Sequence, residues 1–301
     1  MSILSKIRRH GLAGSFIIGY KLLLRKIRAF YYKWRFSNAP QYSNPTHEEL
    51  SAIENDLQEQ GIVISDFRPS TSRFREFQNE NWFPVNYHGG KASGVWDEKL
   101  LEHWIADQLL GLSGYGADDI YVDVAAGSSP WAKTLRARRN MAAYAIDMAP
   151  VSGEFFDLSY YRMENATQSS FKDESVRGVS LQCAYEMFMQ EDDTYLINEL
   201  ARILKPGGKA IILPLYMHTH YCAYATPEYF GKGYSDPKAK EYVRMDCSGI
   251  PSSRKYDAYN LKQRVIETIL REGMKYRLLV LRNKAELGSN IYCHFILEIE
   301  K

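Results

Sequence analysis

The chain has 301 residues, of which 45% are hydrophobic and 25% charged, and its formal net charge is +2. This composition is ordinary for a soluble globular protein and excludes a chain that is disordered overall. The four cysteines form no C-x-x-C pair, so they indicate neither a zinc site nor a redox motif. Two of them lie in apolar runs, which indicates buried, reduced thiols and a cytoplasmic protein.

The small net charge hides an asymmetry between the N-terminus and the rest of the chain. Residues 1–47 contain nine Lys and Arg and no Asp or Glu, so the other 29 of the 38 basic residues face all 36 acidic ones. A basic arm therefore precedes an acidic body.

Apolar side chains of the arm recur at helical spacing and form one stripe. The stripe consists of Phe16, Tyr20, Leu23, Leu24, Ile27, Phe30, Tyr31 and Trp34. Basic residues lie opposite the stripe and on its flanks: Lys21, Arg25, Lys26, Arg28, Lys33 and Arg35. The apolar run 16–24 is too short to span a bilayer, and no signal-peptide cleavage site follows it.

This pattern predicts that residues 1–36 lie as a helix on an anionic membrane surface, at the inner face of the membrane. The alternative is that the stripe packs on the body or on a partner subunit. Nucleic acid is not predicted as a partner, because no nucleic-acid motif accompanies the basic residues. The sequence does not predict an oligomeric state.

The segment between the arm and the second half of the chain is predicted to be a helical and loop cap, residues 45–117. A linker ends at residue 44, so that the arm and linker cover residues 1–44. Thr46 and Glu49 form a capping box that predicts a helix ending near Gln60. Residues 61–94 have no clear period, and 97–110 are predicted to be helical.

From Asp119 onward the pattern changes to alternating short strands and helices, which predicts a parallel sheet with helical crossovers. The first strand, 120–124, runs into D-V-A-A-G-S-S-P, and the second strand ends at Asp147. Small residues in the turn let the backbone approach a ligand, and an acid 20 residues after Gly127 can accept hydrogen bonds from a ribose. By itself this pattern also fits a dinucleotide-binding unit or a plain βαβ unit.

Two further stretches carry a family resemblance. Residues 162–188 read R-M-E-N-A-T-Q-S-S-F-K-D-E-S-V-R-G-V-S-L-Q-C-A-Y-E-M-F, and residues 201–213 read A-R-I-L-K-P-G-G-K-A-I-I-L. Together with the D-V-A-A-G-S-S turn, they resemble the class I S-adenosylmethionine (SAM)-dependent methyltransferases, of the type 11 and type 12 kind. The chain is also similar to bacterial methyltransferases of cell-surface polysaccharide pathways.

The resemblance implies an α/β fold with a Rossmann-like, seven-stranded and mostly parallel sheet that ends in a C-terminal antiparallel hairpin. Residues 118–301 would form this domain, with a helix at 256–272, strands at 275–281 and 291–299, and a substrate-lid insertion at 216–256. The N-terminal helical segment would be an accessory to it.

The resemblance also implies roles for ten residues in binding SAM. Asp123, Ala125, Gly127 and Ser129 would line its methionine part. Asp147 would hold the ribose, while Met148, Asn165 and Ala166 would meet the adenine. Gln182 and Cys183 would lie near the sulfonium. The sequence departs from the family where Ala125 and Ser129 replace glycines, Asn165 replaces an Asp, and the segment 185–187 lacks a His.

The acceptor is predicted from residues outside this motif set. His218 and His220 follow the fifth strand and point the same way in an extended chain, which predicts a general base with an orienting partner, two metal ligands, or two exposed loop residues. The lid is rich in tyrosine, whose rings stack on sugars. These features predict methyl transfer to a sugar hydroxyl of a membrane-associated glycan or glycolipid. The alternatives are O- or N-methylation of an isoprenoid or secondary metabolite, and an inactive methyltransferase fold that serves as an interaction module.

Overall fold

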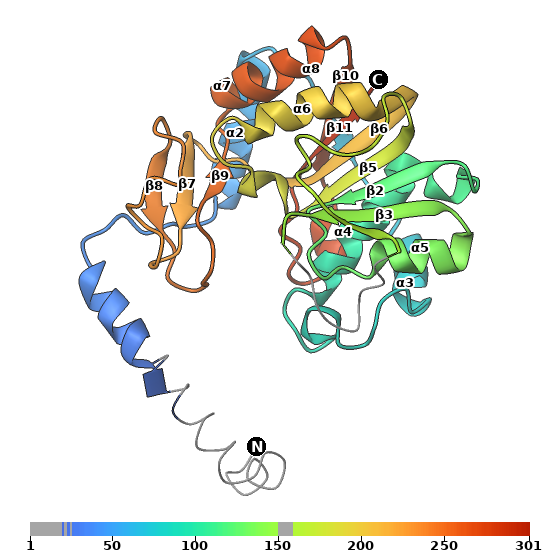
Figure 1. Cartoon of the computed structure of the whole chain (residues 1–301). Coiled ribbons are helices and arrows are strands. Elements are labelled where there is room, and N and C mark those ends of the chain that lie inside the picture. Colours follow the sequence, from blue (N-terminus) through green and yellow to red (C-terminus); the bar gives the residue numbers. More distant parts are fainter. Residues whose placement is uncertain (1–19, 21–22, 25, 150–158) are drawn as a thin grey trace, which may run out of the picture.

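A central sheet of eight strands organises the computed structural model, which describes residues 20, 23, 24, 26–149 and 159–301 (Figure 1). The strand order is β1-β10-β11-β6-β5-β2-β3-β4. Their bounds are β1 Ile64–Phe67, β2 Ile120–Val124, β3 Ala142–Asp147, β4 Tyr161–Met163, β5 Val176–Gln182, β6 Leu204–Leu215, β10 Lys275–Leu281 and β11 Phe295–Glu300. Only β11 runs antiparallel to its neighbours. This confirms the Rossmann-like, mostly parallel sheet and its antiparallel C-terminal hairpin.

Three details of the sheet differ from the sequence prediction. An eighth strand, β1, pairs in parallel with β10. The sequence did not predict it, because its four residues, with a mixed burial pattern, are too few to show a strand period. The helix before the Pro-Gly-Gly turn ends at Ile203, and the turn forms an irregular part of β6, where the pairing with β5 shifts register. The last strand begins at Phe295 rather than at Ile291.

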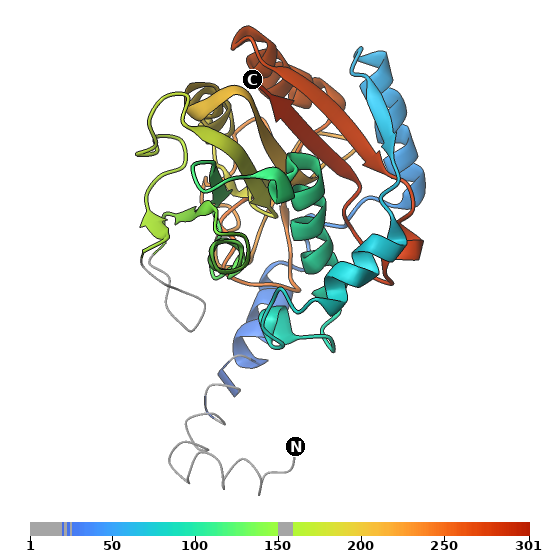
Figure 2. The same cartoon turned by 90° about the vertical axis from the view of Figure 1, so that its right-hand side faces the viewer.

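Helices cover both faces of the sheet and bury a separate apolar core on each (Figures 1 and 2). One core is formed with α2 His47–Glu59, α6 Asp192–Ile203, α7 Ala258–Leu261 and α8 Glu267–Arg271. The other is formed with α3 Thr71–Asn79, α4 Trp96–Leu110, α5 Trp131–Arg139 and α9 Lys284–Leu287. Ile211 and Ile212 lie in opposite cores, because successive side chains of a strand point to opposite faces. This two-sided burial explains the unbroken apolar run of β6.

Two predicted helices are present in modified form. The capping box of Thr46 and Glu49 is formed, and α2 ends one residue before Gln60. The helix predicted at 256–272 is divided into α7, a π-helical turn at Lys262–Ile266, and α8.

The insertion after β6 forms a small second sheet with the order β8-β7-β9. Its strands are β7 Cys222–Ala225, β8 Lys240–Val243 and β9 Ser253–Lys255. The linker that follows the arm runs along β8, because Val243 exchanges backbone hydrogen bonds with Pro40 and Tyr42, each of 2.9 Å. The arm therefore joins the body at the small sheet.

The described part of the arm is helical at residues 26–35 and stands away from the body (Figure 1). Its apolar side chains are exposed, Phe30 by 76% and Trp34 by 72%. Phe36, just after the helix, packs edge-on against Phe230 at 5.5 Å between ring centroids. Phe16, Lys21 and Arg25 of the predicted stripe and basic faces lie outside the described residues. Within the described part of the chain, no helix has the length and apolar character needed to span a bilayer.

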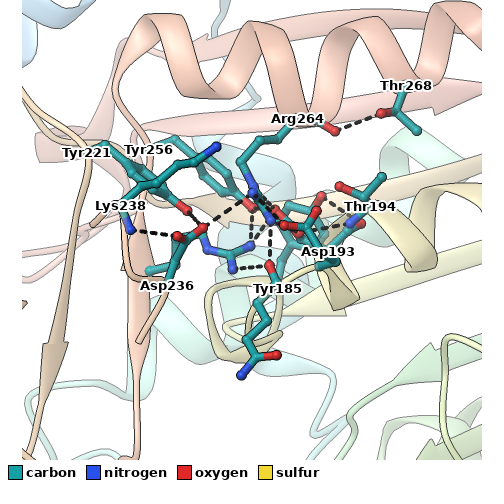
Figure 3. Close-up of polar contacts among 12 residues, drawn as sticks. Tyr185, Asp193, Thr194, Tyr221, Asp236, Lys238, Tyr256, Arg264 and Thr268 are labelled. Carbon is teal, nitrogen blue, oxygen red and sulfur yellow. Dashed lines mark hydrogen bonds and ion pairs between the residues drawn. The ribbon is translucent and has the colours of Figure 1, made fainter. Parts of the chain in front are cut away.

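A buried carboxylate fastens the small sheet to the main body (Figure 3). Asp193, near the start of α6, is fully buried. It pairs with Arg254 of β9 and with Arg264, at 2.7 Å from Nη2 to Oδ1, and accepts a hydrogen bond of 2.5 Å from the Tyr256 hydroxyl. Burial opposes ionisation of Asp193, but the hydrogen bonds and the two arginine charges outweigh it and lower its pKa.

Arg264 extends this network to the loop between β7 and β8. Its Nη1 lies 3.3 Å from Asp236 Oδ2, which also accepts a hydrogen bond of 2.8 Å from the Tyr221 hydroxyl. Residues from three separate stretches of chain thus meet around two carboxylates (Figure 3).

Replacing Asp193 by Ala should lower the free energy of unfolding by about 3–5 kcal/mol, because it leaves the buried charge of Arg254 without a counter-ion. Chemical denaturation measures the change. The matched control is Asp173→Ala, which removes a carboxylate that is 75% exposed and pairs with Arg202; it should cost less than about 1 kcal/mol. Because the folded pKa of Asp193 is lowered, its contribution is present above about pH 4 and is lost as the pH falls further. Equal losses in the two variants would contradict the anchoring role.

Candidate active site

Two adjoining cavities lie at the carboxyl ends of β2, β3 and β5, where ligands bind in open parallel sheets. The first has a volume of about 370 Å³ and is lined by Asp147, Met148, Asn165 and Ala166, among others. The second has a volume of about 290 Å³ and is lined by Asp123, Gly127, Ser129 and Gln182, among others. Ala125 and Cys183 line both cavities. The structure thus brings all ten residues predicted to bind SAM to one continuous site; the role of each stays a prediction.

Asp147 holds together the two turns that border the first cavity. Its Oδ2 accepts a hydrogen bond of 2.8 Å from the Gly127 amide, and its Oδ1 accepts one of 2.9 Å from Ala149. These bonds fix the carboxylate at the end of β3. Each oxygen keeps a further lone pair, so the carboxylate could also accept hydrogen bonds from a ribose diol.

Asp123 is a buried carboxyl group at the second cavity. It is 1% exposed, and its Oδ2 has no hydrogen-bond partner among the described residues. Burial raises the pKa of Asp123 to about 8, and the negative charge of Asp147 adds to this, while a hydrogen bond from Ser129 opposes it. A buried oxygen without a partner fits a cationic ligand group, such as the ammonium group of the methionine part of SAM.

Three non-glycine residues around the second cavity have left-handed backbone conformations. They are Ala125 with φ 53°, Cys183 with φ 50° and His88 with φ 47°. Ala125 replaces a family glycine at a position that does require positive φ, whereas Ser129 does not. Such a backbone costs about 1–2 kcal/mol, and it concentrates at ligand-binding sites.

Helix α4 supplies several polar groups that the motif analysis did not find. Glu102 has a fully buried side chain and pairs with Lys99 at 3.0 Å, and His103 Nε2 lies 3.0 Å from the Tyr87 hydroxyl. Lys99, Glu102 and His103, together with Tyr87 and His88 from the preceding loop, line the second cavity. The sequence signal that could have indicated these residues is the charged side chains of α4, a helix that also carries two tryptophans.

A third cavity, with a volume of about 480 Å³, lies on the other side of Cys183. It is lined by four tyrosines, Tyr42, Tyr216, Tyr224 and Tyr292, and by residues from β6, β9 and the loop before β11. Cys183 Sγ lies 3.2 Å from the Tyr216 hydroxyl and 3.4 Å from that of Tyr292. These three side chains form a hydrogen-bonded partition between the second and third cavities.

Glu102 reaches the same partition from the second cavity. Its Oε1 accepts hydrogen bonds from Cys183 Sγ at 3.1 Å and from the Tyr292 hydroxyl at 3.3 Å. A carboxylate therefore lies where the two cavities meet.

His218 and His220 line none of these three cavities. His220 Nε2 lies 2.8 Å from the Tyr242 hydroxyl, and the two imidazole rings contact each other at 4.5 Å between centroids. Burial lowers the pKa of each imidazole. With Cys222 they form the one group in the described chain whose ligand atoms, all within 4.8 Å of one another, could hold a metal ion. The sequence prediction named the two histidines as possible metal ligands but did not include Cys222. The spacing could have indicated it, because positions 218, 220 and 222 share one face of an extended chain.

Comparison with known families agrees with this geometry. Residues 122–212 match a methyltransferase domain. The match runs from within β2 to within β6 and includes all ten predicted cofactor residues. It supports a SAM-dependent methyltransferase, with SAM as the cofactor.

Solved structures of methyltransferases are similar to this chain at low identity. A SAM-dependent methyltransferase from Methanosarcina mazei is 15% identical over 62% of this chain and 93% of that one, with a TM-score of 0.41. A geranyl diphosphate C-methyltransferase from Streptomyces coelicolor A3(2) is 13% identical over 77% and 98%, with a TM-score of 0.40. A putative methyltransferase from Haloferax volcanii, in complex with the Trm112 activator, is 15% identical over 69% and 92%, with a TM-score of 0.38. Since these values are low, nothing about the acceptor follows from them. No curated protein sequence matches this chain.

The methyltransferase site should bind S-adenosylhomocysteine, the stable product of SAM, more tightly as the pH rises from about 6 to 8. Asp123 holds a proton below its pKa of about 8, and the ligand's ammonium group favours the carboxylate, so binding must release that proton. The affinity should then approach a tenfold gain per pH unit and level off above pH 8. Isothermal titration calorimetry at several pH values measures this.

The variant Asp123→Asn should bind more weakly and lose the pH dependence. As a control, Asp147→Ala should weaken binding by about tenfold or more, because charge-assisted hydrogen bonds are lost. It should keep a pH dependence, shifted to lower pH, because burial still raises the pKa of Asp123 but the charge of Asp147 no longer adds to it. A wild-type affinity that does not change with pH would refute the role of Asp123.

Proposed function

We propose that this chain transfers a methyl group from SAM to a sugar hydroxyl of a membrane-associated glycan or glycolipid, of the kind made in cell-surface polysaccharide pathways. The observation that supports this acceptor is the third cavity, which is lined by four tyrosines and separated from the cofactor site only by the partition at Cys183. Tyrosine offers an apolar ring and a polar hydroxyl, and both suit a sugar ring.

The arm supports a membrane-bound acceptor. Its helix ends at residue 35, and Tyr42, seven residues later, already lines the third cavity. Tyr42 is held there by its backbone hydrogen bond to Val243. An acceptor that enters the cavity would therefore lie close to the exposed apolar stripe of the arm.

The chemistry asks little of the protein beyond positioning and proton removal. SAM supplies an electrophilic methyl group, which an acceptor oxygen takes up as the bond from methyl carbon to sulfur breaks. Asp123 and Asp147 would hold the cofactor, and the buried cavities would exclude water. A hydroxyl acceptor placed at the partition would give its proton to a base.

Glu102 is the carboxylate best placed to act as that base, because its Oε1 contacts both Cys183 and Tyr292. The sequence-based alternative is His218 or His220. Neither histidine lines the cofactor cavities or the third cavity, so the geometry favours Glu102 over this alternative.

Full-length protein, given SAM labelled in its methyl group, should label glycolipids in a solvent extract of membranes from the organism that encodes it. The label should resist mild alkali, as an ether does. Glu102→Gln should lower kcat by about a hundredfold or more, since it removes the base. This loss should exceed any loss of affinity for S-adenosylhomocysteine, whose cavity Glu102 also lines.

The double variant His218→Ala/His220→Ala separates the two candidate bases. We expect it to keep most of the activity; a loss of activity together with an active Glu102→Gln would assign the base to a histidine. Label only in water-soluble products would contradict the membrane acceptor.

The arm should bind the full-length protein to vesicles that contain phosphatidylglycerol, and less to vesicles of phosphatidylcholine alone. Lys26, Arg28, Lys33 and Arg35 are exposed, and each basic residue is worth about 1 kcal/mol near an anionic surface. Sedimentation measures binding, and high salt should weaken it. A chain that begins at Ser37 keeps the pairing of residues 40–42 with β8 and should stay in the supernatant while it still binds S-adenosylhomocysteine.

Replacing Lys26, Arg28, Lys33 and Arg35 together by Gln separates charge from apolar contact. This variant should lose the preference for phosphatidylglycerol but keep a weak affinity for both vesicle types, since its apolar stripe is intact. If the full-length protein binds neither kind of vesicle, the exposed stripe is instead a surface for protein contact. The chain that begins at Ser37 should then differ from the full-length protein in oligomeric state, which light scattering measures.

A further inference from the structure

The third cavity carries an excess of positive charge. Its lining includes Arg244, Lys255 and Lys284, and among the described residues that line it there is no Asp or Glu. Its other ionisable groups are tyrosines and His294, and burial lowers the pKa of His294 to about 4, so that this imidazole is neutral at pH 7. The cavity therefore presents cations without counter-ions in its wall.

Lys255 is the most deeply buried of the three cations. It is 2% exposed, and its Nζ donates a hydrogen bond of 3.0 Å to Ser253 Oγ and lies 3.8 Å from the ring centroid of Tyr216. It makes no ion pair among the residues that the structure describes. Burial lowers its pKa to about 8, so the amine is mostly charged at pH 7. A buried ammonium group without an anion is costly, and the structure retains one at the cavity.

Lys284 lies at α9 and is half-buried, and it also lacks an ion pair in the described part of the chain. The carboxylates that act on its charge are Glu54 and Glu98. Glu54 already pairs with Arg282 at 2.7 Å and shares a hydrogen bond of 2.8 Å with His294. Glu98 accepts hydrogen bonds from two backbone amides, and burial, with the charge of Glu102, raises its pKa. Neither carboxylate forms an ion pair with Lys284.

The carboxylate that acts on Lys255 is Glu186, and it does not neutralise that lysine by contact either. Glu186 Oε2 has no hydrogen-bond partner in the described chain, and burial raises its pKa. Arg244, the third cation, pairs with Asp246 at 2.7 Å, but that carboxylate is 69% exposed and lies outside this cavity. Asp246 engages Nε and Nη2 of the guanidinium, which leaves Nη1, for which no hydrogen bond to a described residue is found, available to a ligand.

We propose that the third cavity binds a phosphoryl group of the acceptor, so that the substrate is a phosphate or diphosphate ester of a sugar rather than a neutral glycan. Arg244, Lys255 and Lys284 would contact its oxygens, while the tyrosines would hold the sugar against the partition at Cys183. Three cations with no acidic residue in the wall match a group with about two negative charges better than a single carboxylate. This inference rests on the proposed function, because it assigns the acceptor of the same reaction.

Inorganic diphosphate is a suitable probe, titrated calorimetrically into full-length protein already saturated with S-adenosylhomocysteine, at fixed ionic strength. It should bind without displacing the cofactor product. Lys284→Gln and Arg244→Gln should each weaken diphosphate binding by about tenfold, the loss of one charge-assisted contact, with unchanged affinity for S-adenosylhomocysteine. Lys275→Gln is the matched control, since it removes one exposed lysine charge from β10, outside this cavity, and it should bind diphosphate as the wild type does.

Three outcomes would overturn the inference. They are no diphosphate binding to protein that binds S-adenosylhomocysteine, equal binding by all the variants, or preferential binding of glucuronate, which would indicate a carboxylate acceptor. A failure to bind S-adenosylhomocysteine would instead count against the proposed function itself, and the two failures are therefore distinguishable. Because Lys255 is buried, Lys255→Met serves as a second test only if its melting temperature stays close to that of the wild type.

Discussion

The buried Asp193 carboxylate is the constraint on which the arrangement of the site depends. It lies at the start of α6 in the main body, whereas Arg254 belongs to β9 of the small sheet. Burying a charge is costly unless it is paired, so the contact between Asp193 and Arg254 favours this arrangement of the two parts of the chain. The pair orients β9, and Lys255, the next residue, then faces the opposite way and lines the third cavity. The anchoring contact and the cavity wall are thus two faces of the same short strand.

Two polar groups that lack full partners lie where ligands are proposed to bind. Asp123 Oδ2 has no hydrogen-bond partner in the described chain, and Lys255 has no ion pair there. Ala125 and Cys183 add left-handed backbone at the same place. Each of these features costs folding free energy. The two apolar cores of the main sheet, by contrast, are continuously packed. Stability and ligand binding are therefore divided between the cores and the carboxyl ends of the strands.

The two halves of the proposed reaction are separated by one layer of side chains. Cys183 borders both cofactor cavities, and its Sγ contacts Tyr216 and Tyr292, which border the third cavity. Glu102 contacts the same layer from α4. Methyl transfer needs the acceptor oxygen in direct contact with the methyl carbon, so these side chains would have to move aside for a donor on one side to react with a hydroxyl on the other, close to a carboxylate. The linker after the arm forms part of the far wall through Tyr42, which connects the exposed apolar stripe to the acceptor side.

The sequence by itself determined most of the main sheet, β1 excepted, and led to the residues predicted to hold the cofactor, because their signals are local. The apolar strands, the small-residue turn after β2 and the acid that ends β3 follow each other within a short stretch of chain, and parallel strands bring their carboxyl ends to one edge. The acceptor side was decided only by tertiary structure. Lys99 and Glu102 come from α4, Tyr42 from the linker, and Lys255 and Tyr292 from near the C-terminus. No spacing in the sequence links these residues, since only the folding of the small sheet and the loop before β11 onto the main sheet brings them together. His218 and His220 are neighbours in sequence, but the tertiary structure places neither of them in the lining of these cavities.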